Sequence, residues 1–293
     1  MKKAHLAIIT ANVIFGLGVP VTKYLLTDWV SPNVYMLSRC VGAALIFWLI
    51  AVSMPREEVS RRDLFVMIGA GLLGFVVSQT LTAWALNYTS PIYYSLIAML
   101  TPVAVMLIAA ATIGERITPR RLVGIVLGVG GAVLMVALRW QSDSGSNDLL
   151  GIALAVLSLL TWAVYLIMTR RVSATYSPVT QMKWMFLVST VAIMPFAWSE
   201  VPATQLYGQP FVAATVWGAA AMLFIVVFAT VLGYFFIPYA MKHLDATTVS
   251  AYTNLQPVVA ALTAIAVGQD VFTWDKPVAA VLVLAGAWIV SKE

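Results

Sequence analysis

The chain has 293 residues, of which 61% are hydrophobic and only 10% are charged, and its mean hydropathy is +0.93. Soluble domains carry about 25% charged residues, and a soluble fold of this length could not bury so much apolar surface, so lipid is the solvent that this composition requires. The net charge of +5 does not indicate nucleic-acid binding, because the basic residues lie in short loops between apolar runs, and the single cysteine, Cys40, excludes a disulfide within the chain.

A helix needs about 20 predominantly apolar residues to cross the hydrocarbon core of a membrane. Ten windows of the sequence meet this requirement, so we predict an all-α integral membrane protein with ten transmembrane helices. In chain order the windows are Ala4–Tyr24, Asn33–Ser53, Leu64–Trp84, Pro91–Ile113, Arg121–Leu138, Leu149–Met168, Val179–Trp198, Phe211–Tyr239, Thr247–Gly268 and Pro277–Val290.

The most polar stretch of the chain, RWQSDSGSND, spans residues 139–148 and divides the windows into two sets of five. We predict a first five-helix unit over residues 1–140, a polar linker over 141–148 and a second unit over 149–293. The start of the chain, Met1-Lys2-Lys3 before an apolar run, also fits a signal peptide. No small-x-small cleavage pattern follows that run, so we interpret it as a retained helix.

The basic residues predict the orientation of the helices. With the N-terminus in the cytoplasm, 12 of the 17 lysines and arginines fall in cytoplasmic segments, three fall on the opposite side, and Arg39 and Lys183 lie inside helices. Cytoplasmic loops of membrane proteins are enriched in lysine and arginine. Both termini are therefore predicted to be cytoplasmic, in the inner membrane of a bacterial cell.

The two units resemble each other in sequence. When residues 85–134 are aligned without gaps to residues 240–289, 14 of the 50 pairs are identical, including Pro102 with Pro257 and Ser95 with Ser250. Because each unit has an odd number of predicted crossings, the second unit would be inverted relative to the first. Inverted repeats with a site at their interface are a recurrent plan of transporters.

Six features together resemble the EamA-type transporters of the drug/metabolite transporter superfamily. They are the five-plus-five repeat, the segment Trp84-Ala85-Leu86-Asn87-Tyr88-Thr89-Ser90, Pro102, Gly114-Glu115-Arg116, the glycines 124, 128, 130 and 131, and Arg39. The resemblance implies ten helices, a central cavity lined mainly by the first, third, fourth, sixth, eighth and ninth, and export of amino acids or related metabolites. The second unit departs from the pattern, with Gln269-Asp270 in place of Gly-Glu and Met185 roughly where a second arginine would stand.

The interior prolines and charges are candidates for function. Pro102 and Pro257 are predicted near the middle of their helices, where each would kink the helix beside the substrate path; packing kinks are the alternative. Arg39 and Lys183 are each predicted about two turns from the noncytoplasmic end. Lys183 is interpreted mainly as an interfacial anchor, whereas Arg39 is interpreted either as an anchor or as a group that packs helices or attracts anions.

No aspartate, glutamate or histidine lies in the interior of a predicted helix, which argues against a multidrug cation antiporter and against a proton relay. Neutral polar and aromatic side chains remain for a substrate cavity, and hydrogen bonds between helices or interfacial anchoring are their alternative roles. The predicted cavity residues are Asn12, Gln79, Trp84, Tyr94, Ser95, Trp162, Tyr165, Tyr234, Asn254 and Gln256.

The sequence therefore favours a multi-pass transporter that exports small polar metabolites by alternating access. An exchanger for sugar phosphates or nucleotide sugars is an alternative, although it would need several cations in the cavity. An intramembrane enzyme is disfavoured, since the sequence has no HExxH motif, no paired aspartates at helical spacing and no central histidine. No cofactor and no metal site are expected. The expected partners are a small-molecule substrate and the lipid bilayer, without nucleic acid; the protein could be a monomer or a homodimer.

Overall fold

Serine–proline pairs open two of the helices. Ser31 accepts a hydrogen bond on its side chain from an amide three residues later, and α2 (Pro32–Val52) follows it. Ser177 caps α9 (Pro178–Ala197) in the same way. The serine oxygen satisfies an amide that has no partner within the helix, and proline at the first helical position has no amide hydrogen to leave unpaired.

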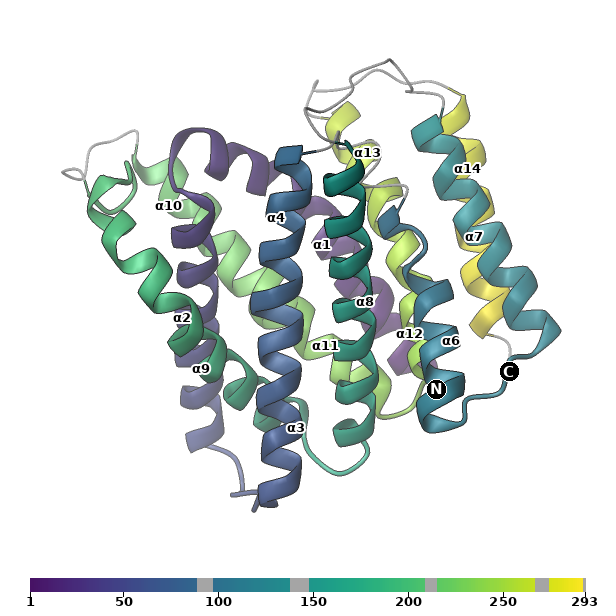
Figure 1. Ribbon diagram of the computed structural model, residues 1–293, viewed down its shortest axis with the longest axis horizontal. Helices are drawn as coiled ribbons and strands as arrows, with labels where there is room; N and C mark the ends of the chain where they lie inside the picture. The colour runs from purple at the N-terminus through teal and green to yellow at the C-terminus, as the bar shows by residue number, and fades with distance from the viewer. Residues whose placement is uncertain (89–96, 138–147, 209–214, 267–273, 292–293) are drawn as a thin grey trace.

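The computed structural model describes residues 1–88, 97–137, 148–208, 215–266 and 274–291. These residues form helices joined by turns, with no strand among them (Figure 1). Besides α2 and α9, the elements are α1 (Lys2–Asp28), α3 (Arg61–Gly71), η1 (Leu72–Val77), α4 (Ser78–Tyr88), α6 (Thr101–Ile113), α7 (Pro119–Ala137), α8 (Asp148–Ser173), η2 (Trp198–Ala203), α10 (Thr215–Phe224), η3 (Ile225–Leu232), α11 (Gly233–Met241), α12 (Ala246–Ala251), η4 (Tyr252–Asn254), α13 (Leu255–Ala266) and α14 (Asp275–Ser291).

Several of these elements join end to end into longer rods. α3, η1 and α4 are continuous, as are α10, η3 and α11, and in both rods the middle element is a π-helix. α12 and α13 are joined by η4, a single turn of 3₁₀-helix. π-Helical turns are rare and widen the helix locally, so their occurrence in two rods marks two places where the helical path is interrupted.

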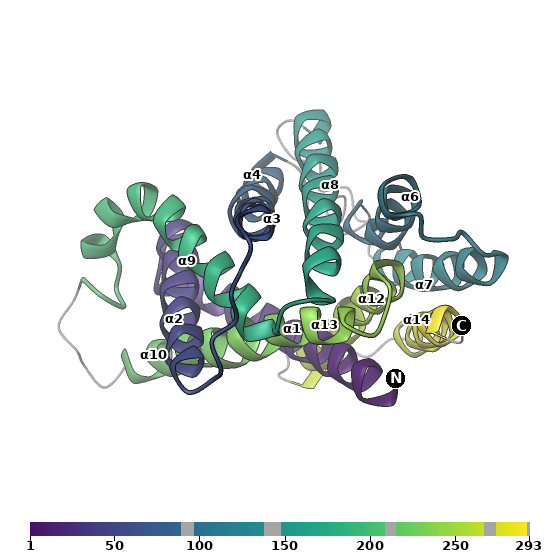
Figure 2. The same ribbon diagram turned by 90° about the horizontal axis from the view of Figure 1, so that it is seen from below.

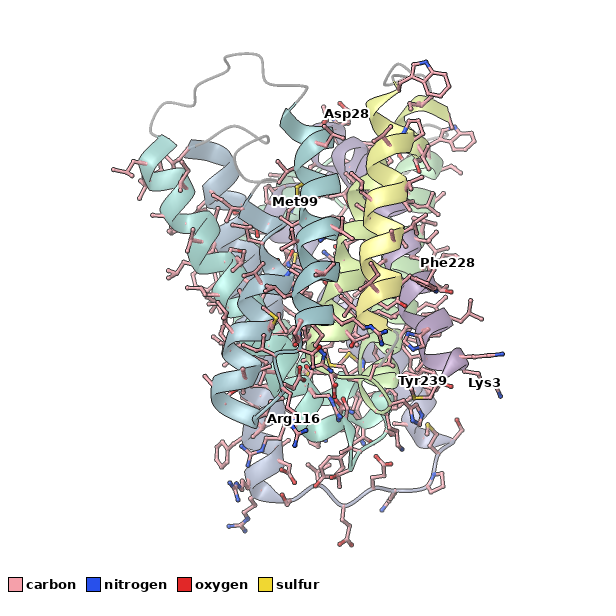
Figure 3. The ribbon with its side chains drawn as sticks, turned by 90° about the vertical axis from the view of Figure 1, so that its right-hand side faces the viewer. Lys3, Asp28, Met99, Arg116, Phe228 and Tyr239 are labelled. Atoms are coloured by element: carbon pink, nitrogen blue, oxygen red, sulfur yellow. The ribbon has the colours of Figure 1, made fainter. Side chains whose placement is uncertain are left out.

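The rods lie side by side, and the connections between them gather at two ends of the bundle (Figures 1 and 2). Asp28 lies at one end, whereas Lys3 and Arg116 lie toward the other (Figure 3). The basic connections after α2, α6, α8 and α11 share the end that holds Lys3. In the described part of the chain, the structure therefore separates an end rich in basic residues from an end with few of them, as the loop composition predicts.

Six helices of the described residues are long and apolar enough to cross a membrane, and they begin at Lys2, Pro32, Arg61, Leu149, Pro178 and Thr215. Large apolar side chains cover the outside of the bundle. Leu49, Phe65 and Trp217 are each at least 70% exposed, which suits contact with lipid and would be unfavourable in water. Shorter apolar helices include Thr101–Ile113 and Val281–Val290, and the count of ten spans stays a prediction.

The two glycine-rich and alanine-rich helices α7 and α14 pack closely against each other. A Cβ atom on Gly124 would lie 2.7 Å from the carbonyl oxygen of Gly286, and a Cβ on Gly286 would lie 2.6 Å from the amide nitrogen of Gly128. Only glycine permits this approach of the two backbones. Elsewhere, α2 packs on α9, α4 packs on α8, and α1 packs on both α11 and α13.

Candidate substrate site

Arg39 projects from α2 toward α11 and the π-helix η3, two turns after the helix begins. Its Nε donates a hydrogen bond to Thr230 Oγ1 (3.0 Å), and its Nη2 lies 3.5 Å from the hydroxyl of Tyr234. The guanidinium also lies over the ring of Tyr35, 5.3 Å from its centroid. Within the described residues, no carboxylate forms an ion pair with Arg39, so a full positive charge is held by neutral groups alone.

The π-helical turn η3 positions Thr230 for this contact. Thr230 Oγ1 donates its hydrogen to the carbonyl of Ile225, five residues earlier (2.9 Å), and therefore accepts from Arg39 with a lone pair. Thr230 is completely buried. Tyr35 is held by a hydrogen bond between its hydroxyl and Thr22 Oγ1 on α1 (2.8 Å). The environment of Arg39 is thus assembled from α1, α2 and the α10–η3–α11 rod.

Tyr234 connects Arg39 to a cluster of aromatic rings in the middle of the bundle. Its ring meets those of Phe75 and Phe15 edge-on, with centroids 4.8 and 5.1 Å apart. Trp162 lies 6.3 Å from Tyr234 and 4.7 Å from Tyr165, which is fully buried. The cluster draws on α1, η1, α8 and α11, so predicted candidates from both halves of the chain come together there.

A second polar contact joins α1 to α13. Gln256 Nε2 donates to Asn12 Oδ1 (2.7 Å), and Asn12 Nδ2 donates to the carbonyl of Ile8 (2.8 Å). Asn254 is buried beside Gly128 of α7. The structure thus brings two of the predicted amides into contact, while Asn254 faces a different helix.

The remaining predicted cavity residues lie elsewhere. Gln79 is half-buried at the start of α4, whereas Trp84, on the same helix, is 56% exposed. Tyr94 and Ser95 lie outside the described residues. A tryptophan so exposed on the outside of the bundle suits the membrane interface better than an enclosed cavity.

The two prolines lie where helices restart. Pro102 falls in the first turn of α6, after a turn at Met99 and Leu100, and Pro257 is the third residue of α13, directly after η4. Both positions differ from the predicted interior of an uninterrupted helix. In the first turn the missing amide hydrogen leaves nothing unpaired. The carbonyl of Ala98, four residues before Pro102, accepts a hydrogen bond from the hydroxyl of Thr101 (2.6 Å).

Lys183 lies five residues into α9, and its Nζ is 5.1 Å from the ring centroid of Trp48 and 5.9 Å from that of Trp184. α9 begins at the end of the bundle where Ser177 is bonded to Glu57, whereas α2 begins at the opposite end. The prediction that Lys183 and Arg39 lie near the same end is therefore wrong. The two helices run in opposite directions, so equal distances from their starts lead to opposite ends.

A buried ionic cluster ties together connections at the basic end. Glu115 accepts hydrogen bonds from the Ala246 amide (2.9 Å) and the Thr247 hydroxyl (2.6 Å) at the start of α12, and it lies 3.6 Å from Arg121. Arg121, which is 4% exposed, also pairs with Asp245. Gly114 ends α6 with φ +70°, a conformation that favours glycine, and so turns Glu115 toward α12.

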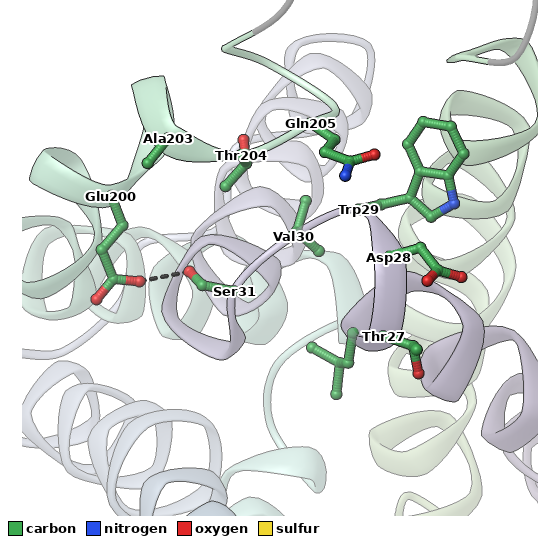
Figure 4. Close-up of a pocket in the computed structure, with 10 residues that line it drawn as sticks. Thr27, Asp28, Trp29, Val30, Ser31, Glu200, Ala203, Thr204 and Gln205 are labelled. Atoms are coloured by element: carbon green, nitrogen blue, oxygen red, sulfur yellow. Dashed lines mark hydrogen bonds between the residues drawn. The ribbon is translucent and has the colours of Figure 1, made fainter.

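Two surface hollows lie at the other end. The first has a volume of about 350 Å³ and is lined by the α1–α2 connection and by residues near η2 (Figure 4). At its edge Ser31 Oγ and Asn33 Nδ2 both bond to the carboxylate of Glu200. The second, of about 330 Å³, is mostly apolar and lies between Leu206 and Val226. Arg39 and the aromatic cluster do not line either hollow.

Two stretches of the chain, residues 2–137 and 149–292, match the model of the EamA-like transporter family. The chain belongs to the EamA-like transporter family. It is 26% identical to YyaM of Bacillus subtilis (strain 168), described as an uncharacterized transporter, over 84% of this chain and 79% of that protein. It is 24% identical to a probable terminal-alkyne amino-acid exporter of Streptantibioticus cattleyicolor, over 85% of this chain and 78% of that protein.

The fold is also that of a solved structure. One crystal structure of another protein aligns with this chain with a TM-score of 0.80 and 17% sequence identity, over 99% of this chain and 97% of the other. At this identity the likeness concerns the fold alone. Membership of the EamA-like family, and not the likeness of fold, makes this chain a membrane transporter.

Two partners of Arg39 in this EamA-like transporter were not predicted from the sequence. Tyr35 precedes Arg39 by four residues, and side chains at that spacing share one face of a helix, so this contact could have been inferred. Thr230 lies 191 residues from Arg39. No sequence signal could have singled it out, because only the packing of η3 against α2 brings the two together.

Proposed function

We propose that this protein exports small polar metabolites, most specifically amino acids or related compounds, across the bacterial inner membrane. Transport would proceed by alternating access between two inverted five-helix repeats, with both termini in the cytoplasm. Membership of the EamA-like family supports the transport activity, and the relative described as an amino-acid exporter supports the substrate class. One structural observation carries the mechanism: the interruptions of the helices recur at matched positions in the two halves.

The interruptions follow the sequence repeat closely. The π-helix η1 ends before Ser78, and η3 ends before Gly233, which is 155 positions later. α6 begins at Thr101 and α13 begins at Leu255, 154 positions later. Two unrelated halves have no reason to break their helices in register. The agreement supports one ancestral unit used twice, with its breaks retained where the halves meet.

Packing between the halves supports the same symmetry. A Cβ atom on Gly42 of α2 would meet Val226 in η3 at 2.5 Å, and one on Gly71 of α3 would meet Val188 of α9 at 3.0 Å. Position 188 of the second half corresponds to position 42 of the first, because it lies 146 residues later, as Ser177 lies after Ser31. Position 226 corresponds in the same way to position 71, with the offset of 155 found for the aligned segments. Exchanging the two repeats thus turns one glycine–valine contact into the other.

The helix starts of α2 and α9 are bound in a reciprocal manner. Ser31, before α2, bonds to Glu200, which follows α9; Ser177, before α9, bonds to Glu57, which follows α2 (3.0 Å). The two contacts lie at opposite ends of the bundle. This arrangement is expected of two copies related by inversion, because the same contact then appears once at each end.

An exchanger of sugar phosphates or nucleotide sugars is less well supported. Such substrates carry two or more negative charges, which would need several cations in one place. Arg39 reaches the aromatic cluster, but Lys183 contacts the rings of Trp48 and Trp184 on a helix that begins at the opposite end. A single central cation suits a substrate with one carboxylate better.

Counterflow in proteoliposomes tests the proposal. Purified protein would be reconstituted with unlabelled amino acids inside, and uptake of each radiolabelled amino acid from outside would be followed. Saturable exchange of amino acids is the expected result. Exchange of sugar phosphates without exchange of amino acids would overturn the proposed substrate class.

Alanine at Asn254 or Gln256 should reduce counterflow while the protein stays folded and inserted. Gln256→Ala removes the bond to Asn12, whose loss alone corresponds to about 0.6 kcal/mol in membrane proteins. The melting temperature should therefore change little. Unchanged counterflow in both variants would assign these amides to packing between helices.

A further inference from the structure

Arg39 is a half-buried cation of the bundle, and it has no counterion among the described residues. A guanidinium has five N–H donors, and Arg39 makes one good hydrogen bond, to Thr230, with long contacts to Tyr234 and to the sulfur of Met36 (3.8 Å). Acidic residues in the described part of the chain lie in connections or in the first or last turn of helices. The charge is thus partly enclosed by the bundle, and no described carboxylate neutralises it.

Such an arrangement leaves donors of the Arg39 guanidinium that an anion could bind. Arg39 lies two turns from the start of α2, so the cost of about 2.5–3.5 kcal/mol that insertion scales give for an arginine at the helix centre is an upper bound for it. Its guanidinium contacts Tyr35 and Met36, about one turn nearer the start of α2. It also contacts Thr230 and Tyr234 of the α10–η3–α11 rod. The corresponding position of the second half, 146 residues later, is Met185, so a neutral side chain serves the same packing position there.

The surroundings of Arg39 define what kind of anion would fit. A carboxylate matches the planar fork of a guanidinium and carries one negative charge, as Arg39 carries one positive charge. Beyond Tyr234 the ligand would meet the rings of Phe15, Phe75 and Trp162. Aromatic faces accept both apolar side chains and ammonium groups, the latter through cation–π contact.

We propose that Arg39 and the Tyr234 hydroxyl form a carboxylate-binding subsite, with the aromatic cluster around Tyr234 holding the remainder of a zwitterionic amino acid. This inference rests on the proposed function and names the group of the substrate that is recognised. The ammonium is recognised by aromatic rings and neutral oxygens, since the described interior offers no carboxylate to it. Transport therefore depends on the carboxylate of the cargo more strongly than on its amino group.

Substrate analogues test the subsite in the unmodified protein. Counterflow of a transported radiolabelled amino acid would be competed with the same amino acid, its primary amide and the corresponding amino alcohol. The amide and the alcohol keep the ammonium but lack the carboxylate. We expect their half-inhibiting concentrations to be about 10- to 100-fold higher, the range for losing a hydrogen bond between charged groups. Equal competition by the amide would overturn the subsite and leave the proposed function intact.

Variants then locate the effect. Arg39→Met copies the residue found in the other half and should raise the half-saturating concentration of the amino acid by at least about tenfold. Arg39→Lys keeps the charge without the fork and should recover part of the affinity. Lys183→Met removes the other intramembrane cation, which contacts Trp48 and Trp184, and should leave counterflow unchanged. Equal loss in the Arg39 and Lys183 variants would indicate a general charge effect and overturn the assignment.

A third measurement separates failure of the subsite from failure of the proposed function. The melting temperature of the detergent-purified protein would be recorded with amino acids, with hydroxy acids and with the amides. If hydroxy acids stabilise the unmodified protein but not Arg39→Met, and no amino acid is exchanged, the subsite stands and the substrate class falls. If no carboxylate compound stabilises the protein or exchanges, both fall.

Discussion

Substituting Gly124 tests whether α7 and α14 pack as closely as the structure shows. An alanine Cβ at Gly124 would lie 2.6 Å from Val290 Cγ2 and 2.7 Å from the carbonyl oxygen of Gly286. Real Cβ atoms do not come so close, and the carbonyl belongs to a helix backbone that cannot rotate away. The two helices must therefore separate locally.

The size of the effect follows from the kind of contact. Forcing an extra methyl group into a well-packed interface lowers the free energy of unfolding by about 1–3 kcal/mol. For soluble domains of roughly 150–250 residues, each kcal/mol corresponds to about 2–4 °C in Tm. We expect Gly124→Ala to lower the Tm by roughly 2–12 °C. Gly286→Ala, whose Cβ would lie 2.5 Å from the Gly124 oxygen, should act in the same direction.

Gly130, on the same helix, is the matched control. A Cβ there would meet nothing within 4 Å, and alanine has the higher helix propensity, by about 0.8–1.0 kcal/mol. Gly130→Ala should therefore leave the Tm unchanged or raise it.

The single cysteine provides the assay. Cys40 is 1% exposed in α2, so a thiol-reactive fluorophore reports opening of the bundle, and far-UV circular dichroism follows the loss of helix in parallel. A Tm for Gly124→Ala equal to or above that of Gly130→Ala by both measurements would refute the close packing of α7 on α14.

Further predictions concern the two ends of the bundle. Glu115→Gln removes the negative charge that binds the start of α12 and Arg121, and it should lower the Tm. Glu58→Gln removes an exposed negative charge at the same end and should leave the Tm unchanged. Equal Tm values for the two variants would contradict the role of the ionic cluster. Burial alone would raise the pKa of Glu57, but hydrogen bonds from Thr180 and Ser177 hold that pKa below its usual 4.5. A lowered pKa stabilises the fold above the unfolded pKa, and this contribution is lost as pH falls through the folded value. Thermal stability should therefore drop below about pH 4.5, and this drop should be smaller in Glu57→Gln; an unchanged pH profile would show that the contact does not stabilise the protein.

The sequence by itself determined the class of the protein and the placement of many helices. Apolar runs must become helices in lipid, because backbone groups there find partners only within the chain. Ser31-Pro32 and Ser177-Pro178 start helices in the structure because capping is a local interaction. The basic residues lie at one end because successive helices run in opposite directions, so that every second connection falls at the same end. Gly124 and Gly128 of α7 likewise pack against α14, as small residues on a membrane helix allow.

Only the tertiary structure decided which polar groups meet. Asn12 and Gln256 are two separate candidates in the sequence, and only the packing of α1 against α13 brings them into contact. Thr230 is a partner of Arg39 only because of the π-helical turn of η3. Lys183 and Arg39 appear equivalent in sequence, but their helices run in opposite directions. Lys183 therefore contacts Trp48 and Trp184, whereas Arg39 contacts Tyr234 of the aromatic cluster. Helix formation is local and readable from spacing, whereas the neighbours of a side chain depend on contacts between segments far apart in the chain.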